Sequence, residues 1–147
     1  MSDLYDEDFV LWTEQQATLL RRRAAGELVN DAEVDWQNLA EEIEAVGGNT
    51  RRELRSRLVR LLQHLLKSHY QPGQRSRSWR ATIRTERQEI EDLLADNPSL
   101  RARLPEFFAA AYPRARIAAL EETGLLDLPE APPFGIEQVL GDEMSEE

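Results

Sequence analysis

Apolar residues recur at spacings of three and four along most of this chain, which is the period of one face of an α-helix. Residues that cap or break helices separate five such segments. The segments lie at about residues 6–23, 30–46, 49–70, 78–95 and 105–123. No stretch alternates apolar and polar residues for long enough to predict a strand. The pattern therefore predicts an all-α fold.

Glycine, proline and aspartate positions set the expected helix ends. Asp3 or Asp6 is expected to cap the first helix, since a short acidic side chain can accept hydrogen bonds from the first turn. Gly47-Gly48 is expected to break or kink the chain between the second and third helices. Pro113 predicts a kink or a split in the fifth.

The carboxy-terminal part of the chain lacks the long helical pattern of the preceding segments. Three prolines between residues 128 and 135 predict an extended strap, which a short helical turn over residues 136–140 follows. The sequence thus predicts one domain over residues 1–147, a bundle of five or six helices with a Pro-rich carboxy-terminal strap. Its core is expected at about residues 4–126, the strap and turn at 127–140, and a frayed acidic tail at 141–147.

The periodicity also predicts which faces are buried. The third segment has the widest apolar face and is expected to be the most buried helix. Its apolar positions are Leu54, Leu58, Leu61, Leu62, Leu65 and Leu66. The apolar stripe expected on the second helix is Trp36, Leu39, Ala40, Ile43 and Val46.

Composition removes several classes of function. The chain has no cysteine, which excludes disulfides, zinc–thiolate sites, iron–sulfur clusters and a cysteine nucleophile. Residues 1–8 are acidic and lack the basic and apolar regions of a signal peptide. The apolar runs fall far short of the roughly 20 residues that span a bilayer. We therefore expect a cytoplasmic protein without a membrane partner.

The net charge of −10 is distributed unevenly. Residues 1–50 carry 3 basic and 12 acidic side chains, residues 51–103 carry 13 and 6, and residues 104–147 carry 2 and 10. The basic middle can bind nucleic acid or pair with its own acidic flanks. Internal pairing is the preferred interpretation, because an acidic protein repels phosphate at long range.

Polar residues on apolar faces are the candidate site residues, because a buried charge is costly without a partner. Arg87 shares a face with Ile83 and Ile90, and Glu42, at the edge of the second helix's apolar face, is its first candidate partner. An ion pair between helices and an anion-binding site both remain open. The candidate polar cluster is Glu41, Glu42, Glu44, His64 and Arg87, to which the family resemblance described below adds Lys67.

No metal or cofactor is expected at these residues. Carboxylate-bridged metal sites in helical bundles use Glu-x-x-His, but leucines stand three residues before both histidines. The histidines are five residues apart, which also excludes the His-x-x-x-His spacing. Neither a Gly-x-Ser-x-Gly nucleophile elbow nor a glycine-rich phosphate loop occurs.

One local segment mixes arginines with an aromatic side chain, a combination suited to phosphate contact and base stacking. The candidate surface residues are Arg75, Arg77, Trp79 and Arg80. The alternative is a solvated basic loop before a helix whose first large core residue is Trp79.

The order of several short motifs resembles the bacterial family known as domain of unknown function number 29. The motifs are Tyr5-Asp6-x-Asp8-Phe9-x-x-Trp12, Gln16-Ala17-x-Leu19-Leu20-Arg21, Asn38-Leu39-x-Glu41-Glu42-Ile43-Glu44, His64-Leu65-Leu66-Lys67, Ser78-Trp79-x-x-Thr82-Ile83 with Arg87, Pro98-Ser99-Leu100 and Glu122-Thr123-Gly124-Leu125. One departure is Ala131-Pro132-Pro133-Phe134, where the family often carries a Cys-Pro-Phe-like stretch.

The resemblance implies a compact, helical, single-domain protein and no particular reaction. It marks as positions of interest Trp12, Gln16, Glu41, Glu42, Glu44, His64, Lys67, Trp79 and Arg87.

The sequence favours a non-enzymatic helical module that binds protein, either itself or another chain. One alternative is a nucleic-acid-associated protein that uses residues 51–103. The other is an enzyme with a Glu/His/Arg site between the second, third and fourth helices. The sequence does not predict an oligomeric state.

Overall fold

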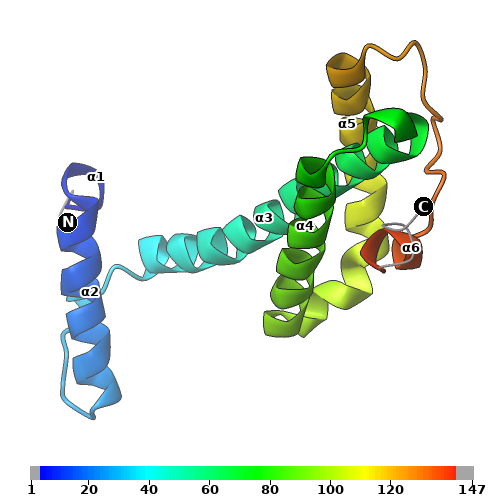
Figure 1. Ribbon diagram of the computed structural model, residues 1–147. Coiled ribbons are helices and arrows are strands. Elements are labelled where there is room, and N and C mark those ends of the chain that lie inside the picture. The colour runs from blue at the N-terminus through cyan, green and yellow to red at the C-terminus, as the bar shows by residue number, and fades with distance from the viewer. Residues whose placement is uncertain (1–3, 142–147) are drawn as a thin grey trace. The chain divides into compact units, whose positions relative to one another are not determined.

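The computed structural model describes residues 4–141 and is all-α (Figure 1). The α-helices within these residues are α1 (Leu4–Glu7), α2 (Phe9–Ala24), α3 (Trp36–Tyr70), α4 (Arg77–Asp96), α5 (Leu104–Thr123) and α6 (Ile136–Leu140). Short 3-10 helices cover Asp31–Glu33, Pro72–Gln74 and Pro98–Arg103. The predicted all-α fold of five or six helices is confirmed. The proposed Asp3 cap and the tail from residue 142 lie outside the described residues.

The chain forms two compact units, which are described separately below. The amino-terminal unit comprises the described residues up to Gly48, and the carboxy-terminal unit comprises those from Asn49. No helix within residues 4–141 combines the length and the apolarity needed to cross a bilayer.

The first predicted helix is interrupted at Asp8, so the prediction of one helix over residues 6–23 was wrong. Asp8 lies between α1 and α2, and its Oδ1 accepts a hydrogen bond from Leu11 N at 3.0 Å. An aspartate that caps in this way satisfies a backbone N–H that the helix itself leaves unpaired. This local hydrogen bond begins α2 at Phe9.

Of the two alternatives predicted at Gly47-Gly48, a break or a kink, the break was wrong, because α3 continues through both glycines. A glycine inside a helix costs about 1 kcal/mol relative to alanine, too little to end a helix that has good helix formers at residues 41–45 on one side and 51–55 on the other. Residues 31–33, predicted as the start of this helix, form a 3-10 turn instead. Asp35 comes next, and its backbone O accepts a hydrogen bond from Leu39 N at 2.9 Å.

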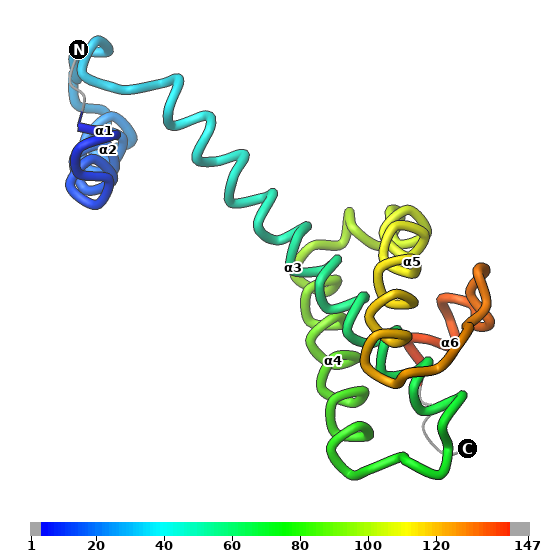
Figure 2. The backbone as a smooth tube through the Cα atoms, turned by 90° about the horizontal axis from the view of Figure 1, so that it is seen from above, coloured from blue at the N-terminus to red at the C-terminus, as the bar shows by residue number. Residues whose placement is uncertain are grey.

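The leucine stripe of α3 forms the centre of the carboxy-terminal unit, as predicted. All six leucines are buried. The second half of α3 lies side by side with α4 and α5 (Figures 1 and 2). The other large side chains of this core are Ile83, Ile90, Leu94, Leu100, Leu104, Phe107, Phe108, Tyr112, Leu128, Phe134 and Val139.

Helix α5 is one helix despite its internal proline, so Pro113 does not split it. Pro113 is exposed, and Ala111 and Ala115 on the buried side let the helix approach the core closely. The helix ends at Gly124, whose φ of +72° places it in the left-handed region that favours glycine.

The predicted strap and final helical turn are confirmed. No helix occurs between residues 124 and 135, and α6 follows. The Tyr112 hydroxyl donates to Pro129 O at 2.5 Å, and Arg116 Nε donates to Leu128 O at 2.9 Å. Leu128 and Phe134 of the strap are buried in the core. These contacts close one side of the carboxy-terminal unit.

The amino-terminal unit has a much smaller core than predicted. Of its large apolar side chains only Trp12 and Val34 are buried. The expected buried stripe on the second helix was wrong for four of its five residues, because Trp36, Ala40, Ile43 and Val46 are exposed. A repeat of three and four identifies an apolar face, but a unit this small has little of its own surface to cover it.

Candidate functional site

Lys67 is the only lysine in the chain, which has 17 arginines. Its side chain is 2% exposed, although lysine is rarely buried unless it is paired. Lys67 Nζ lies 2.7 Å from Glu122 Oε1 and 4.6 Å from the centre of the Trp79 ring. A carboxylate and an aromatic face therefore compensate the buried charge.

Two further side chains complete this group. Gln63 Nε2 donates to Glu122 Oε2 at 2.6 Å, so both carboxylate oxygens accept hydrogen bonds. The hydrogen bond from Lys67, the largest cause, lowers the pKa of Glu122. His64 Nδ1 lies 2.9 Å from Arg60 O, and burial is the main cause that lowers the pKa of His64. We call Gln63, His64, Lys67, Trp79 and Glu122 the Lys67 cluster.

The Lys67 cluster joins three helices of the carboxy-terminal unit. Gln63, His64 and Lys67 come from α3, Trp79 from α4 and Glu122 from α5. The ammonium and carboxylate groups pair with each other, an arrangement typical of a tie between helices. The sequence indicated Lys67 and Trp79 through the family resemblance but missed the partners Gln63 and Glu122.

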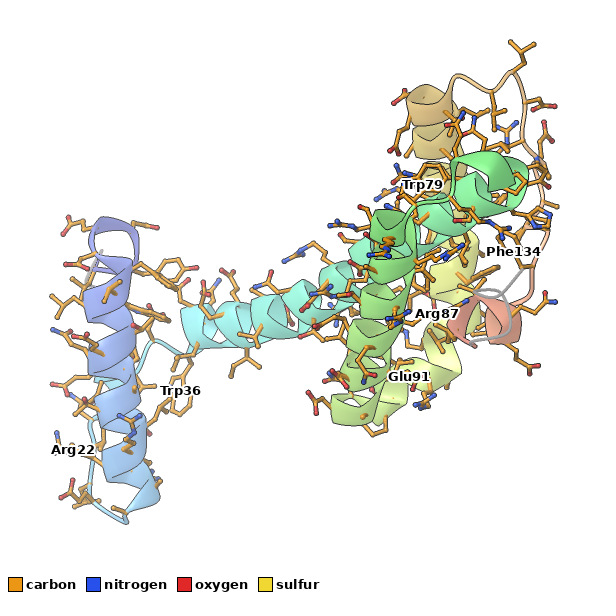
Figure 3. All side chains as sticks on the ribbon, viewed as in Figure 1. Arg22, Trp36, Trp79, Arg87, Glu91 and Phe134 are labelled. Atoms are coloured by element: carbon orange, nitrogen blue, oxygen red, sulfur yellow. The ribbon has the colours of Figure 1, made fainter. Side chains whose placement is uncertain are left out.

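Arg87, labelled in Figure 3, is buried as predicted, and its guanidinium donates hydrogen bonds to backbone oxygens of α6. Its Nε donates to Val139 O at 2.9 Å and its Nη2 to Gln138 O at 3.4 Å. A cation favours the carbonyl end of a helix, where the last backbone oxygens lack partners. Arg87 therefore holds α6 against α4.

The predicted acidic members of the polar cluster, Glu41, Glu42 and Glu44, belong to the amino-terminal unit. Glu42 Oε1 accepts a hydrogen bond from the Tyr5 hydroxyl at 2.5 Å. This hydrogen bond, with smaller contributions from burial and neighbouring carboxylates, raises the pKa of Tyr5 to about 12. The pairing of Glu42 with Arg87, and the enzyme hypothesis that uses it, stay predictions.

The predicted surface segment divides into two pairs. Arg75 Nε donates to Ser68 O at 2.8 Å, and Trp79 is half-buried beneath the Lys67 ammonium. Arg77 and Arg80 are exposed. The ring of Trp79 is therefore already used by Lys67, whereas the two exposed arginines face solvent.

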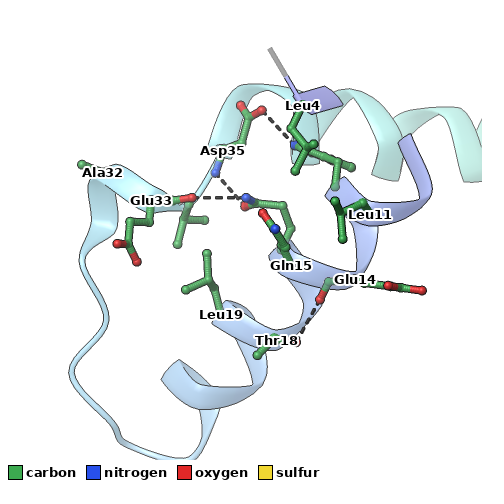
Figure 4. Close-up of a pocket in the computed structure, with 12 residues that line it drawn as sticks. Leu4, Leu11, Glu14, Gln15, Thr18, Leu19, Ala32, Glu33 and Asp35 are labelled. Carbon is green, nitrogen blue, oxygen red and sulfur yellow. Dashed lines mark hydrogen bonds between the residues drawn. The ribbon is translucent and has the colours of Figure 1, made fainter. Parts of the chain in front are cut away.

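The amino-terminal unit contains a pocket of about 660 Å³ between α2 and the segment that precedes α3 (Figure 4). Its volume lies in the range of small-molecule and side-chain binding sites. The lining residues are Leu4, Leu11, Trp12, Glu14, Gln15, Gln16, Thr18, Leu19, Ala32, Glu33, Val34 and Asp35.

The side chains of Gln16 and Asp35, which line this pocket, are already paired. Gln16 Nε2 donates to Glu33 O at 3.2 Å, and Gln16 Oε1 accepts from Asp35 N at 2.8 Å. The Asp35 carboxylate accepts from Trp12 Nε1 at 3.1 Å and from Asn38 Nδ2 at 2.7 Å. The Asn38 hydrogen bond is the largest cause of the lowered pKa of Asp35. Because these polar groups already have partners, the pocket offers mainly its apolar side chains to a ligand. It therefore suits an apolar side chain better than a polar ligand.

Exposed apolar side chains are concentrated in the amino-terminal unit, which contains this pocket. Eight of the eleven large apolar side chains that are exposed within residues 4–141 belong to it. They are Phe9, Val10, Leu11, Leu20, Leu28, Trp36, Ile43 and Val46. Single exposed apolar residues are ordinary, but this density on so short a unit is typical of an interaction surface.

Within residues 4–141, no three His, Asp or Glu side chains lie close enough together to hold a metal ion.

Comparison with known proteins identifies the family and nothing beyond it. Neither the curated proteins nor the solved structures contain a match to the chain. The model of one family, "Domain of unknown function DUF29", matches residues 4–144, nearly the whole chain. The chain therefore belongs to the DUF29 family.

Proposed function

We propose that this protein is a non-enzymatic protein-interaction module that binds its partner through the amino-terminal unit. The proposal rests on the numbers of buried and exposed large apolar side chains in that unit. The unit buries two large apolar side chains and exposes eight. Burial of apolar area is the main driving force for association, so a partner that covers these residues stabilises the unit.

The pocket supports the same conclusion. Large side chains seated in apolar pockets supply most of the binding free energy at protein interfaces. Trp12 and Val34 form fixed walls because both are buried, and Gln16 is held at both ends of its amide. The pocket is therefore a suitable seat for an apolar side chain of the partner.

Photo-crosslinking tests this proposal in cells that produce the full chain. We place benzoylphenylalanine at position 43, where Ile43 is 71% exposed, and separately at position 126, where Leu126 is 101% exposed. The matched pair compares an exposed apolar position in the amino-terminal unit with one in the strap. Crosslinks to protein are expected from position 43 and not from position 126.

One further variant decides whether the apolar face causes the crosslinks. The double substitution Trp36→Ala and Val46→Ser, introduced beside the crosslinker at 43, is expected to abolish the products. If crosslinks are absent from position 43, or persist unchanged in the double variant, the proposal is wrong.

Nucleic-acid binding is a second candidate, favoured by one observation. Arg77, Arg80 and Arg84 are exposed on α4 and make no ion pair within residues 4–141. The occupied ring of Trp79 and the net charge of −10 weigh against it. A gel shift at low salt with single- and double-stranded oligonucleotides tests it, and absence of a shift disposes of it.

A further inference from the structure

The pocket in the amino-terminal unit is lined by acidic side chains on both sides. Glu14, on α2, and Glu33, in the 3-10 helix, contribute to opposite sides of the pocket (Figure 4). Both are exposed, so they lie where the pocket opens to solvent, and we call them the acidic rim. Asp35 also lines the pocket. Among the twelve described residues that line it, three are therefore acidic and none is basic.

The acidic rim has no cation of its own. Neither Glu14 nor Glu33 takes part in an ion pair within residues 4–141. The basic side chains of residues 4–48 are Arg21–Arg23 in the last turn of α2, and none of them lines the pocket. A partner that covers the pocket must therefore supply positive charge, because a carboxylate that loses its water without gaining a cation is costly.

Apolar side chains lie beside the acidic rim. Leu11, Gln15 and Leu19 follow one another at intervals of four along α2, so they form one row on the helix surface that is about 12 Å long. Leu11 is 40% exposed, which leaves this row open to a ligand. Glu14 comes three residues after Leu11 and neighbours it on the helix. Apolar contact and ion pairing are thus available to one ligand at the same time.

We propose that the pocket binds a basic segment of another protein, which places a large apolar side chain in the pocket and pairs Lys or Arg side chains with the acidic rim. The inference rests on the proposed function and names the chemistry of its partner. The stems of lysine and arginine cover apolar surface while their charged ends pair with carboxylates, so basic neighbours of the apolar side chain suit both parts of the site. A neutral or acidic segment would cover Glu14 and Glu33 and leave them unpaired.

Selection of peptides from a random display library tests this inference, with the full chain as the target. Peptides that bind the wild type are expected to carry a large apolar residue with Lys or Arg close to it in sequence. The rim variant carries Glu14→Lys and Glu33→Lys. It is expected to select Asp or Glu at the same places, because the charge of the rim is then reversed. Loss of the fold cannot produce such an exchange of preference.

Two further variants locate binding at the pocket. Gln15 is exposed and lines the pocket, so Gln15→Trp is expected to fill the pocket and weaken the selected peptides at least about tenfold. The control variant carries Glu121→Lys and Glu130→Lys, which make the same change of net charge at exposed positions of the carboxy-terminal unit. It is expected to keep the wild-type preference for basic peptides. Fluorescence polarisation of labelled synthetic peptides measures the affinities, and circular dichroism checks that each variant keeps its helices.

Other outcomes of these measurements overturn the inference. They include a library that yields no binder, selected peptides without basic residues, a preference that the rim variant leaves unchanged, and equal affinity of the wild type and Gln15→Trp. A preference that the control variant also reverses would show a response to net charge and not to the rim. A wild-type dimer that Gln15→Trp dissociates would assign the pocket to a second copy of the chain.

The inference and the proposed function can fail separately. Crosslinks from position 43 that the double substitution Trp36→Ala and Val46→Ser abolishes still support the interaction module, even if the selected peptides show no preference for basic residues. In that case the partner covers the exposed apolar side chains without using the acidic rim.

Discussion

Among single residues, Lys67 shows how a buried charge is accommodated. Its ammonium meets the Glu122 carboxylate and the Trp79 ring, while its four-carbon stem is packed among core residues of the carboxy-terminal unit. Glu122 is half exposed, so water reaches one side of the ion pair. The packing of the stem therefore contributes more to stability than the ion pair does.

Replacing Lys67 by alanine is expected to lower the free energy of unfolding by about 2–4 kcal/mol, because it leaves a cavity where the stem was. Lys67→Met keeps most of the stem and is expected to cost only about 1 kcal/mol, since Glu122 can be rehydrated. Urea unfolding followed by circular dichroism measures both values. Equal losses in the two variants would show that the charge matters more than the packing.

The stability of the fold is expected to fall below neutral pH partly because of His64. Burial lowers the pKa of His64, so the folded state binds its proton less readily than the unfolded chain. This contribution to stability is present above the ordinary pKa of histidine and is lost as the pH falls through the lowered pKa.

We therefore expect His64→Asn to lose less stability than the wild type when the pH drops from 7.5 to 5.5. Urea unfolding at both pH values gives the comparison. His69→Asn is the matched control, because His69 lies on the same helix but is exposed. An unchanged pH dependence in His64→Asn would contradict the role given to burial.

The sequence predicts which side chains are buried more readily than it predicts which side chains they contact. Periodicity places Arg87 and the leucines on buried faces because a helix repeats every 3.6 residues. Glu122 lies 55 residues from Lys67, and no local pattern connects them. Beside the family resemblance, the presence of a single lysine among 17 arginines is the signal in the sequence that points to a special environment for Lys67.

At the scale of elements, helix ends follow local chemistry closely. Gly124 ends α5 and Ser76 begins α4, where the Ser76 side chain accepts a hydrogen bond from Trp79 N. Sequence reasoning failed where two local preferences competed. At Gly47-Gly48 the helix continues, because the helix formers around the glycines offset their cost. At Asp8 the helix is interrupted, because the aspartate side chain caps a new helix there.

Gly124→Ala is expected to destabilise the carboxy-terminal unit by about 1 kcal/mol, because an alanine is strained in the left-handed region. Gly73→Ala is the control: an added Cβ meets nothing within 4 Å there, and the backbone is not left-handed. Its effect is expected to stay within about 0.5 kcal/mol. Thermal unfolding of both variants measures the difference, and equal shifts would contradict the conformational explanation.

In the molecule as a whole, stability is distributed unevenly between the two units. The carboxy-terminal unit has a continuous core of leucines, aromatic residues and strap residues. The amino-terminal unit buries Trp12 and Val34 and is otherwise fixed by the hydrogen bonds around Gln16 and Asp35. Local opening is easiest where few apolar contacts must be broken.

Hydrogen exchange measured by mass spectrometry is expected to show this difference. At low protein concentration, amides of α2 are expected to exchange at least about tenfold faster than amides of α3 between residues 54 and 66. Protection of α2 equal to that of the leucine stripe under these conditions would show that the amino-terminal unit has a stability that its own core does not explain.

The burial of Lys67 has a practical consequence. Because it is the only side-chain amine, the folded chain presents no accessible lysine to acylating reagents or to enzymes that modify lysine. Modification at this position requires that the contacts with Trp79 and Glu122 open first. The extent of lysine acylation therefore reports directly on how often the carboxy-terminal unit opens, without any label added to the protein.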